Sequence, residues 1–115
     1  MPADTGKQEG FLRNLNVTKK YEVNLTRHAQ NDLEHIFYYI AADSPNNAAN
    51  FTLDLEKHVS SLDTFPERHP LIPENEFFGT DYRHLIYRKY RIIYRIMESS
   101  VFILRIIHGA KLLKV

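Results

Sequence analysis

Cysteine is absent from the 115-residue sequence. A disulfide scaffold and a thiolate metal site are therefore excluded, and the absence is compatible with a reducing compartment. No apolar run approaches the roughly 18 residues that a membrane-spanning helix needs. Residues 1–10 lack the apolar stretch of a signal peptide. We therefore expect a cytoplasmic protein without a membrane partner.

Size and composition are those of an ordinary globular protein. Hydrophobic residues make up 43% of the chain and charged residues 25%. A chain of this length is one domain by the usual prior, and it buries about two-thirds of the surface that its unfolded form exposes. We expect a hydrophobic core that needs no covalent or metal reinforcement.

The formal net charge of +1 conceals a strong asymmetry along the chain. Residues 27–81 hold three lysines or arginines and ten aspartates or glutamates. Residues 82–115 hold eight lysines or arginines and one glutamate. Such asymmetry indicates either an anionic partner for the C-terminal part or mutual neutralisation of the two segments inside the fold. The charge pattern by itself leaves both explanations open.

The first part of the chain divides into a leader and a strand. Residues 1–19 are polar and aperiodic, so we expect a flexible leader, followed by a single domain over residues 20–115. Residues 20–25, KYEVNL, alternate between apolar and polar side chains. A period of two with residues that favour strands predicts a strand with one buried face.

Two amphipathic helices are expected next. Apolar residues recur at steps of three and four over residues 27–42 and again over about 46–64. Thr26 is a suitable N-cap for the first helix, and Ser44 followed by Pro45 is a typical start for the second. The short linker predicts that the two helices form an antiparallel hairpin.

The last third of the chain is predicted to be β-structure. Residues 65–81 have no period, and we expect this connection to be packed by its own Leu71, Ile72, Phe77 and Phe78. Residues 82–88, 90–97 and 101–108 are rich in Ile, Val, Tyr and Phe, and the breaks between them are short enough to demand antiparallel hairpins. The order is β-α-α-β-β-β, which predicts an α+β fold with a helical hairpin on one face of a mostly antiparallel sheet.

Alternation along the strands suggests where the basic side chains point. A two-residue turn at Ser99 and Ser100 would place Arg91 opposite His108, and a turn at residues 88–89 would place His84 opposite Ile93. In this register Arg83 and Arg105 would point to the other face of the sheet. We therefore expect an open sheet face with four side chains suited to an anion: His84, Arg91, Arg95 and His108.

These side chains permit more than one chemistry. Guanidinium groups bind phosphate with two parallel hydrogen bonds, and histidine transfers protons near neutral pH. Such a face could support cleavage of RNA by its own 2′-hydroxyl, or merely hold phosphates or an acidic protein segment. Arginines in strands are also commonly solvated groups at the sheet edge. The histidines show no metal-binding spacing, and no cofactor-binding motif is present, so we expect neither a metal nor a cofactor.

Several of these segments resemble the RelE/ParE superfamily, the toxins of bacterial type II toxin–antitoxin systems. The resemblance is carried by Tyr82-Arg83, by YRIIYRI at residues 90–96, and by the apolar strand that ends in His108-Gly109. The helical hairpin at residues 33–62 and FPERHP at 65–70 are similar to the ParE-type branch. The resemblance covers about residues 20–111.

The resemblance implies a growth-inhibiting toxin, of the kind linked to plasmid stabilization, that forms a hetero-oligomer with a cognate antitoxin. ParE-like members poison DNA gyrase, whereas RelE-like members cleave mRNA on the ribosome without a metal. By the resemblance, Arg91 lies where the RelE branch has a catalytic arginine, Arg83 near its first lysine and Lys111 near its late arginine. His108 would carry a proton in such a reaction. His84, Arg88 and Arg95 would bind the target or the antitoxin.

The second RelE lysine is not matched, because Leu85 lies at about that place. This departure favours the ParE-like branch and a toxin that acts on gyrase. The alternatives are a ribosome-dependent mRNA endoribonuclease and an inactive module that only binds an antitoxin.

Overall fold

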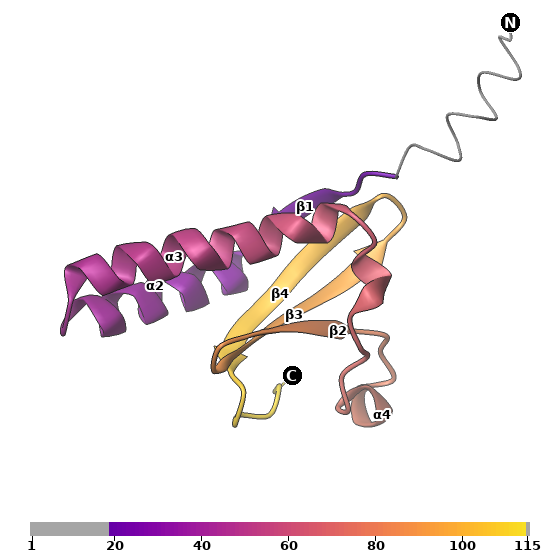
Figure 1. Ribbon diagram of the computed structural model, residues 1–115. Helices are drawn as coiled ribbons and strands as arrows, with labels where there is room; N and C mark the ends of the chain where they lie inside the picture. The colour runs from indigo at the N-terminus through magenta and orange to yellow at the C-terminus, as the bar shows by residue number, and fades with distance from the viewer. Residues whose placement is uncertain (1–18, 115) are drawn as a thin grey trace, which may run out of the picture.

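The structure is a computed structural model that describes residues 19–114, so the predicted leader at residues 1–19 lies outside it except for its last residue. The elements follow the predicted order β-α-α-β-β-β. The connection before the last three strands adds two 3-10 turns, Ser61–Asp63 and Pro66–Arg68, and the short helix α4 (Figure 1). Their bounds are β1 (Glu22–Leu25), α2 (Arg27–Ala41), α3 (Pro45–Ser60), α4 (Asn75–Phe78), β2 (Arg83–Tyr87), β3 (Tyr90–Met97) and β4 (Ser100–His108).

The sequence signals for the helix starts are confirmed. The Thr26 hydroxyl accepts the Ala29 N–H at 3.3 Å and donates to the Ile103 carbonyl at 2.8 Å, which fixes the start of α2 against β4. The Ser44 hydroxyl accepts the Asn47 N–H at 3.2 Å, and Pro45 is the first residue of α3. No helix within residues 19–114 is long and apolar enough to cross a membrane.

The sheet has the spatial order β1-β4-β3-β2, and β1 is parallel to β4 while the other pairs are antiparallel. The α2–α3 hairpin covers one face and extends past the end of the sheet (Figure 1). The main core lies between the helical hairpin and the sheet, and it contains residues of both helices and of the strands. Its fully buried members include Leu55, Leu62, Ile92, Tyr94, Val101 and Ile103.

The opposite face of the sheet is not fully open, in contrast to the prediction. A second apolar cluster buries Ile72, Ile93 and Ile107, with Tyr82 and Leu113 packed against it. The connection before β2 and residues 109–114, called here the C-terminal segment, therefore cover part of this face. Of the four residues expected to pack the connection, Ile72 is buried, but Leu71 and Phe77 are 53% and 87% exposed.

The register of one hairpin differs from the prediction. The turn at residues 88–89 is confirmed, and His84 lies opposite Ile93. In the β3–β4 hairpin, however, Met97 pairs with Ser100, so the turn is at residues 98–99, one position earlier than predicted.

A bulge beside Ile93 and Tyr94 then shifts the pairing again. As a result Tyr90, not Arg91, lies opposite His108, and Arg91 lies opposite Ile107. Because neighbouring side chains in a strand point to opposite faces, Arg91 and His108 are on opposite faces of the sheet. The predicted pair is wrong.

Candidate functional site

Arg91 and Glu74 form a buried ion pair at the end of the sheet. Arg91 on β3 is 5% exposed, and Glu74, just before α4, is 4% exposed. The two terminal guanidinium nitrogens of Arg91 contact the two carboxylate oxygens of Glu74 at 2.7 and 2.8 Å. This bidentate arrangement is the strongest form of such a pair. It fixes the connection before β2 to the outer face of the sheet, which is the face opposite the helical hairpin.

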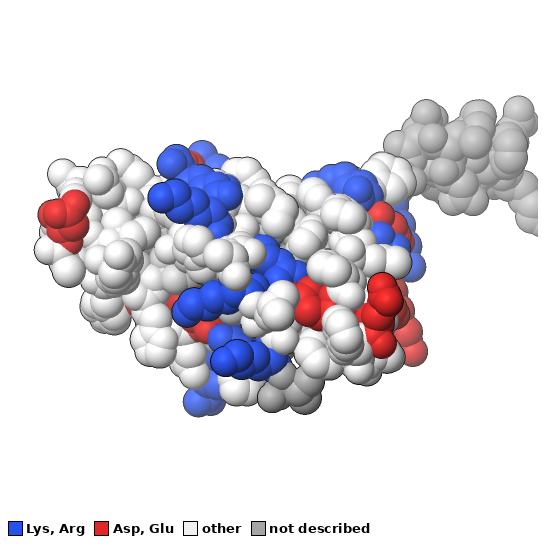
Figure 2. Space-filling view, turned by 90° about the horizontal axis from the view of Figure 1, so that it is seen from below, with Lys and Arg blue, Asp and Glu red and all other residues white. Residues whose placement is uncertain are grey.

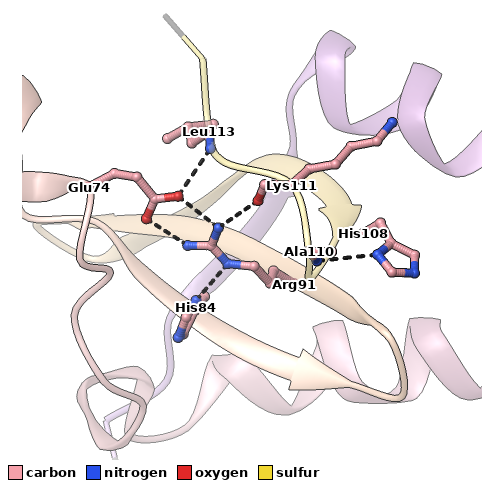
Figure 3. Close-up of polar contacts among 7 residues, drawn as sticks. All are labelled: Glu74, His84, Arg91, His108, Ala110, Lys111 and Leu113. Carbon is pink, nitrogen blue, oxygen red and sulfur yellow. Dashed lines mark hydrogen bonds and ion pairs between the residues drawn. The ribbon is translucent and has the colours of Figure 1, made fainter.

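The same two residues also hold the C-terminal segment and His84 (Figure 3). Arg91 donates to the Lys111 carbonyl at 3.2 Å, and Glu74 accepts the Leu113 N–H at 3.0 Å. The Nε–H of Arg91 donates to Nδ1 of His84 at 3.0 Å. Four hydrogen bonds therefore leave Arg91, which has five N–H donors in all.

The electrostatics of this cluster follow from its contacts. Hydrogen bonds from Arg91 are the main reason that the pKa of Glu74 is lowered to about 2, although burial acts in the opposite direction. Burial first, and then the positive charge of Arg91, lower the pKa of His84. Because Nδ1 of His84 accepts a hydrogen bond from Arg91, the imidazole is neutral, with its proton on Nε2.

His108 belongs to a different surface. It is exposed at the end of β4, and its ring meets the Tyr90 ring edge-on at 5.8 Å between centroids. Nδ1 of His108 accepts the Ala110 N–H at 3.2 Å, so its ring is turned away from Arg91 (Figure 3). The backbone of Lys111 contacts Arg91, but its side chain lies on the His108 side.

A cleft of about 560 Å³ opens there between α2 and the end of β4, and we call it the α2–β4 cleft. Its lining includes Asp32, His35, Tyr39, Tyr90, His108 and Lys111. Arg105 also contributes, and its guanidinium binds both carboxylate oxygens of Asp32 at 2.7 and 3.0 Å. The Ile106 N–H donates to the same carboxylate at 2.8 Å.

The other predicted site residues are dispersed. Arg83 donates to the carbonyls of Glu67 and His69 at 3.1 and 2.7 Å, so it stabilises the connection before β2. Arg88, in the exposed turn after β2, donates to the Tyr87 hydroxyl at 2.9 Å. Arg95 is half-buried on β3. The structure therefore brings together Arg91 with His84 and the Lys111 backbone, while Arg83, Arg88, Arg95 and His108 lie elsewhere.

Sequence reasoning missed Glu74 entirely. It lies in a connection without periodicity that holds three glutamates, and nothing in the sequence distinguishes the one that is buried. Asp32 was missed for a similar reason, since it looks like an ordinary polar position on an amphipathic helix. Within residues 19–114, no group of three or more His, Asp or Glu side chains is arranged to hold a metal ion.

The surface retains much of the basic character of the C-terminal third. Figure 2 shows lysine and arginine side chains gathered across the middle of one face, with carboxylates toward its two ends. The exposed cations from this part of the chain are Arg88, Lys89, Lys111 and Lys114. The Gly109 N–H donates to the Lys89 carbonyl at 2.6 Å, which joins the β2–β3 turn to the C-terminal segment.

Residues 23–113 match the protein family described as ParE toxin of type II toxin-antitoxin system, parDE. The chain belongs to this family. As a ParE-family chain it is a toxin of the RelE/ParE superfamily, and the resemblance found in the strand motifs is confirmed. No curated protein sequence is significantly similar to it.

Two solved structures show the same fold as this ParE-family toxin. The chromosomal ParDE system of P. aeruginosa contains a chain with 21% sequence identity and a TM-score of 0.62, over 79% of this chain and 98% of that chain. The toxin–antitoxin complex RelBE2 of Mycobacterium tuberculosis contains one with 27% identity and a TM-score of 0.53, over 80% of this chain and 94% of that chain. Both support the α+β arrangement described above.

Proposed function

We propose that this toxin inhibits growth by poisoning DNA gyrase, without bond-making chemistry of its own, and that a cognate antitoxin controls it. The observation that carries the proposal is the commitment of Arg91 to Glu74. An arginine that stabilises the charge developing on a phosphate must aim N–H donors at it. In this chain the strand arginine is buried, and four donor contacts go to protein atoms.

The position of His108 supports the same proposal. Cleavage of RNA by its 2′-hydroxyl needs a proton carrier and a phosphate-binding cation around one phosphate. His108 and Arg91 are on opposite faces of the sheet, so they do not meet around one ligand. The match of residues 23–113 to the ParE family agrees with this branch of the superfamily.

An antitoxin partner is proposed from the surface and from the comparisons. The related M. tuberculosis structure is described as a toxin–antitoxin complex. In this chain the outer sheet face has exposed Ile86 and Met97, which are 56% and 44% exposed. Such a surface suits an antitoxin segment that is disordered alone and folds when it binds the sheet. The acidic residues of the segment would then lie near the basic residues of the toxin.

The test is a supercoiling assay with purified toxin and gyrase. We expect inhibition of supercoiling and an accumulation of gyrase-cleaved DNA as the toxin concentration rises. A parallel reaction with a type I topoisomerase, which relaxes the same plasmid, serves as the control for non-specific DNA binding. Full supercoiling at every dose of folded toxin would rule the proposal out.

A RelE-like ribonuclease remains the second candidate, because the M. tuberculosis relative is a RelBE2 toxin–antitoxin complex. Translating ribosomes would be mixed with the toxin, and the mRNA would be mapped by primer extension. Under the gyrase proposal the message stays intact. The ribonuclease would instead be established if the natural chain cleaves the mRNA and the His108→Gln variant, altered at an exposed residue, does not.

An experiment in cells distinguishes an active toxin from an inactive module that only binds antitoxin. Induction without antitoxin would be followed by scoring growth, translation and DNA damage. DNA damage without early translation arrest is the expected result. Normal growth with full accumulation of the folded chain would favour the inactive module.

A further inference from the structure

The α2–β4 cleft has features that the proposed action on gyrase does not use. Its volume of about 560 Å³ falls within the roughly 300–1,000 Å³ of small-molecule sites. It lies on the helix side of the sheet end, and neither Glu74 nor Arg91 lines it. Its floor is the end of β4, and one wall is α2.

The charge balance of the cleft favours an anion. Asp32, the carboxylate in its lining, accepts two hydrogen bonds from Arg105 and one from the Ile106 N–H. Its charge is therefore neutralised within the wall. Lys111 has an exposed side chain, and within residues 19–114 its ammonium has no carboxylate partner within 4 Å. What remains is one cation and the imidazoles of His35 and His108.

His108 is set up as a hydrogen-bond donor. Its Nδ1 accepts the Ala110 N–H at 3.2 Å, so in the neutral ring the proton lies on Nε2. Nε2 is the atom that points away from the backbone (Figure 3). The ring is also held against Tyr90. An N–H donor in a fixed position, in a cleft that Lys111 also lines, suits a phosphate oxygen.

The cleft also offers an aromatic face. Tyr39, on α2, is 80% exposed, and it lies close enough to Tyr90 to contribute to the raised pKa of the Tyr90 phenol, after burial. An exposed ring beside phosphate-binding groups is the arrangement on which nucleobases stack.

We propose that the α2–β4 cleft binds a nucleotide unit, with the phosphate between the His108 Nε2–H and the Lys111 ammonium and the base against Tyr39. The ligand chemistry is a phosphate joined to an aromatic base. It has two sources, a free nucleotide or a nucleotide within single-stranded DNA. The proposal is independent of whether gyrase is the target.

The test uses the purified full-length chain and two probes. Fluorescence anisotropy measures binding of labelled single-stranded DNA of ten thymidines, and calorimetry measures binding of AMP. We expect binding of at least one probe, and the responding probe identifies the source. Tyr39→Ser should weaken that binding about tenfold, because stacking on an aromatic ring is lost. Lys111→Gln should weaken it severalfold and reduce the salt dependence by about one phosphate contact.

Matched controls separate the cleft from general charge and exposure. Tyr38→Ser removes a neighbouring tyrosine that is 67% exposed and does not line the cleft, and Lys57→Gln removes an exposed cation on α3. Both should bind like the natural chain. All four substitutions are at exposed side chains, and circular dichroism would confirm that each variant folds.

Three results would overturn the proposal. One is that neither probe binds. Another is that Tyr39→Ser binds as well as Tyr38→Ser, which would leave only a cationic surface. The third is that inorganic phosphate or a peptide of ten glutamates competes as well as the nucleotide probes, since either would show that the base is not recognised.

Discussion

Arg91 and Glu74 are 17 residues apart in the chain, and their side chains form a two-point ion pair that is almost fully buried. The pair joins β3 to the connection before β2, and both partners also hold the C-terminal segment. Three parts of the chain that are distant in sequence therefore depend on one contact. This makes the pair the natural place to perturb the fold.

Removal of Glu74 should strongly destabilise the protein. Glu74→Ala leaves the Arg91 charge buried without a partner, which costs about 3–5 kcal/mol in the free energy of unfolding. Urea denaturation measures the loss. Glu76→Ala, two positions along and exposed, is the control and should change stability by less than about 0.5 kcal/mol. A loss below about 1 kcal/mol in Glu74→Ala would show that the pair is not structurally important.

Acid should destabilise the protein through the same carboxylate. Its pKa is lowered from 4.5 to about 2 in the folded state, so between these values the unfolded chain binds more protons than the folded one. The stabilisation is fully present above pH 4.5 and is lost as the pH falls toward 2. It amounts to about 3 kcal/mol, at 1.36 kcal/mol per pKa unit.

The measurement is the free energy of unfolding at a series of pH values between 2 and 6, for the natural chain and for Glu74→Gln. The difference between the two should shrink as the pH falls through this window. A difference that stays constant over the whole series would contradict the lowered pKa of Glu74.

The Arg105–Asp32 pair should stabilise the contact between β4 and α2. Asp32→Ala removes three hydrogen bonds and leaves the Ile106 N–H without its acceptor. Because Arg105 can turn to solvent, we expect a loss of about 1–3 kcal/mol. Thermal denaturation would report it, and Asp43→Ala in the exposed hairpin loop is the matched control. Equal melting temperatures for the two variants would disprove the prediction.

Tyr94 should hold the connection before β2 through its hydroxyl. This fully buried side chain donates to the Pro66 carbonyl at 2.6 Å. Tyr94→Phe leaves that carbonyl unpaired in the interior, at a cost of about 1–3 kcal/mol. Hydrogen exchange should also become faster in residues 65–70. Unchanged exchange there, with Tyr38→Phe as the surface control, would show that the bond does not hold the loop.

Much of the fold could be predicted from sequence because its signals are local. Thr26 and Ser44 cap helices through atoms three residues away, and the concentration of Ile, Val, Tyr and Phe marks β2, β3 and β4. The turn at residues 88–89 was also placed correctly. Such features depend on short stretches of chain, so a single sequence contains them.

The candidate site was predicted less well. The strand arginine was identified, but its burial depends on a glutamate 17 residues earlier that no periodic pattern marks. The pairing of Arg91 with His108 failed because the β3–β4 turn lies one residue earlier than predicted and a bulge then shifts the strands. Moving the turn by one residue changes each partner by two positions and keeps the same faces together. The bulge changes the pairing by one position, so it places every later β4 residue on the other face relative to β3.

The sequence by itself determined the order of helices and strands, the helix starts, the concentration of positive charge in the last third and the likeness to toxins of the RelE/ParE superfamily. Only the tertiary structure decided that Arg91 is buried against Glu74 and that His108 faces the α2–β4 cleft. The physical reason is range: helix caps and alternation act over a few residues, whereas burial and the register of a bulged hairpin depend on packing between distant segments.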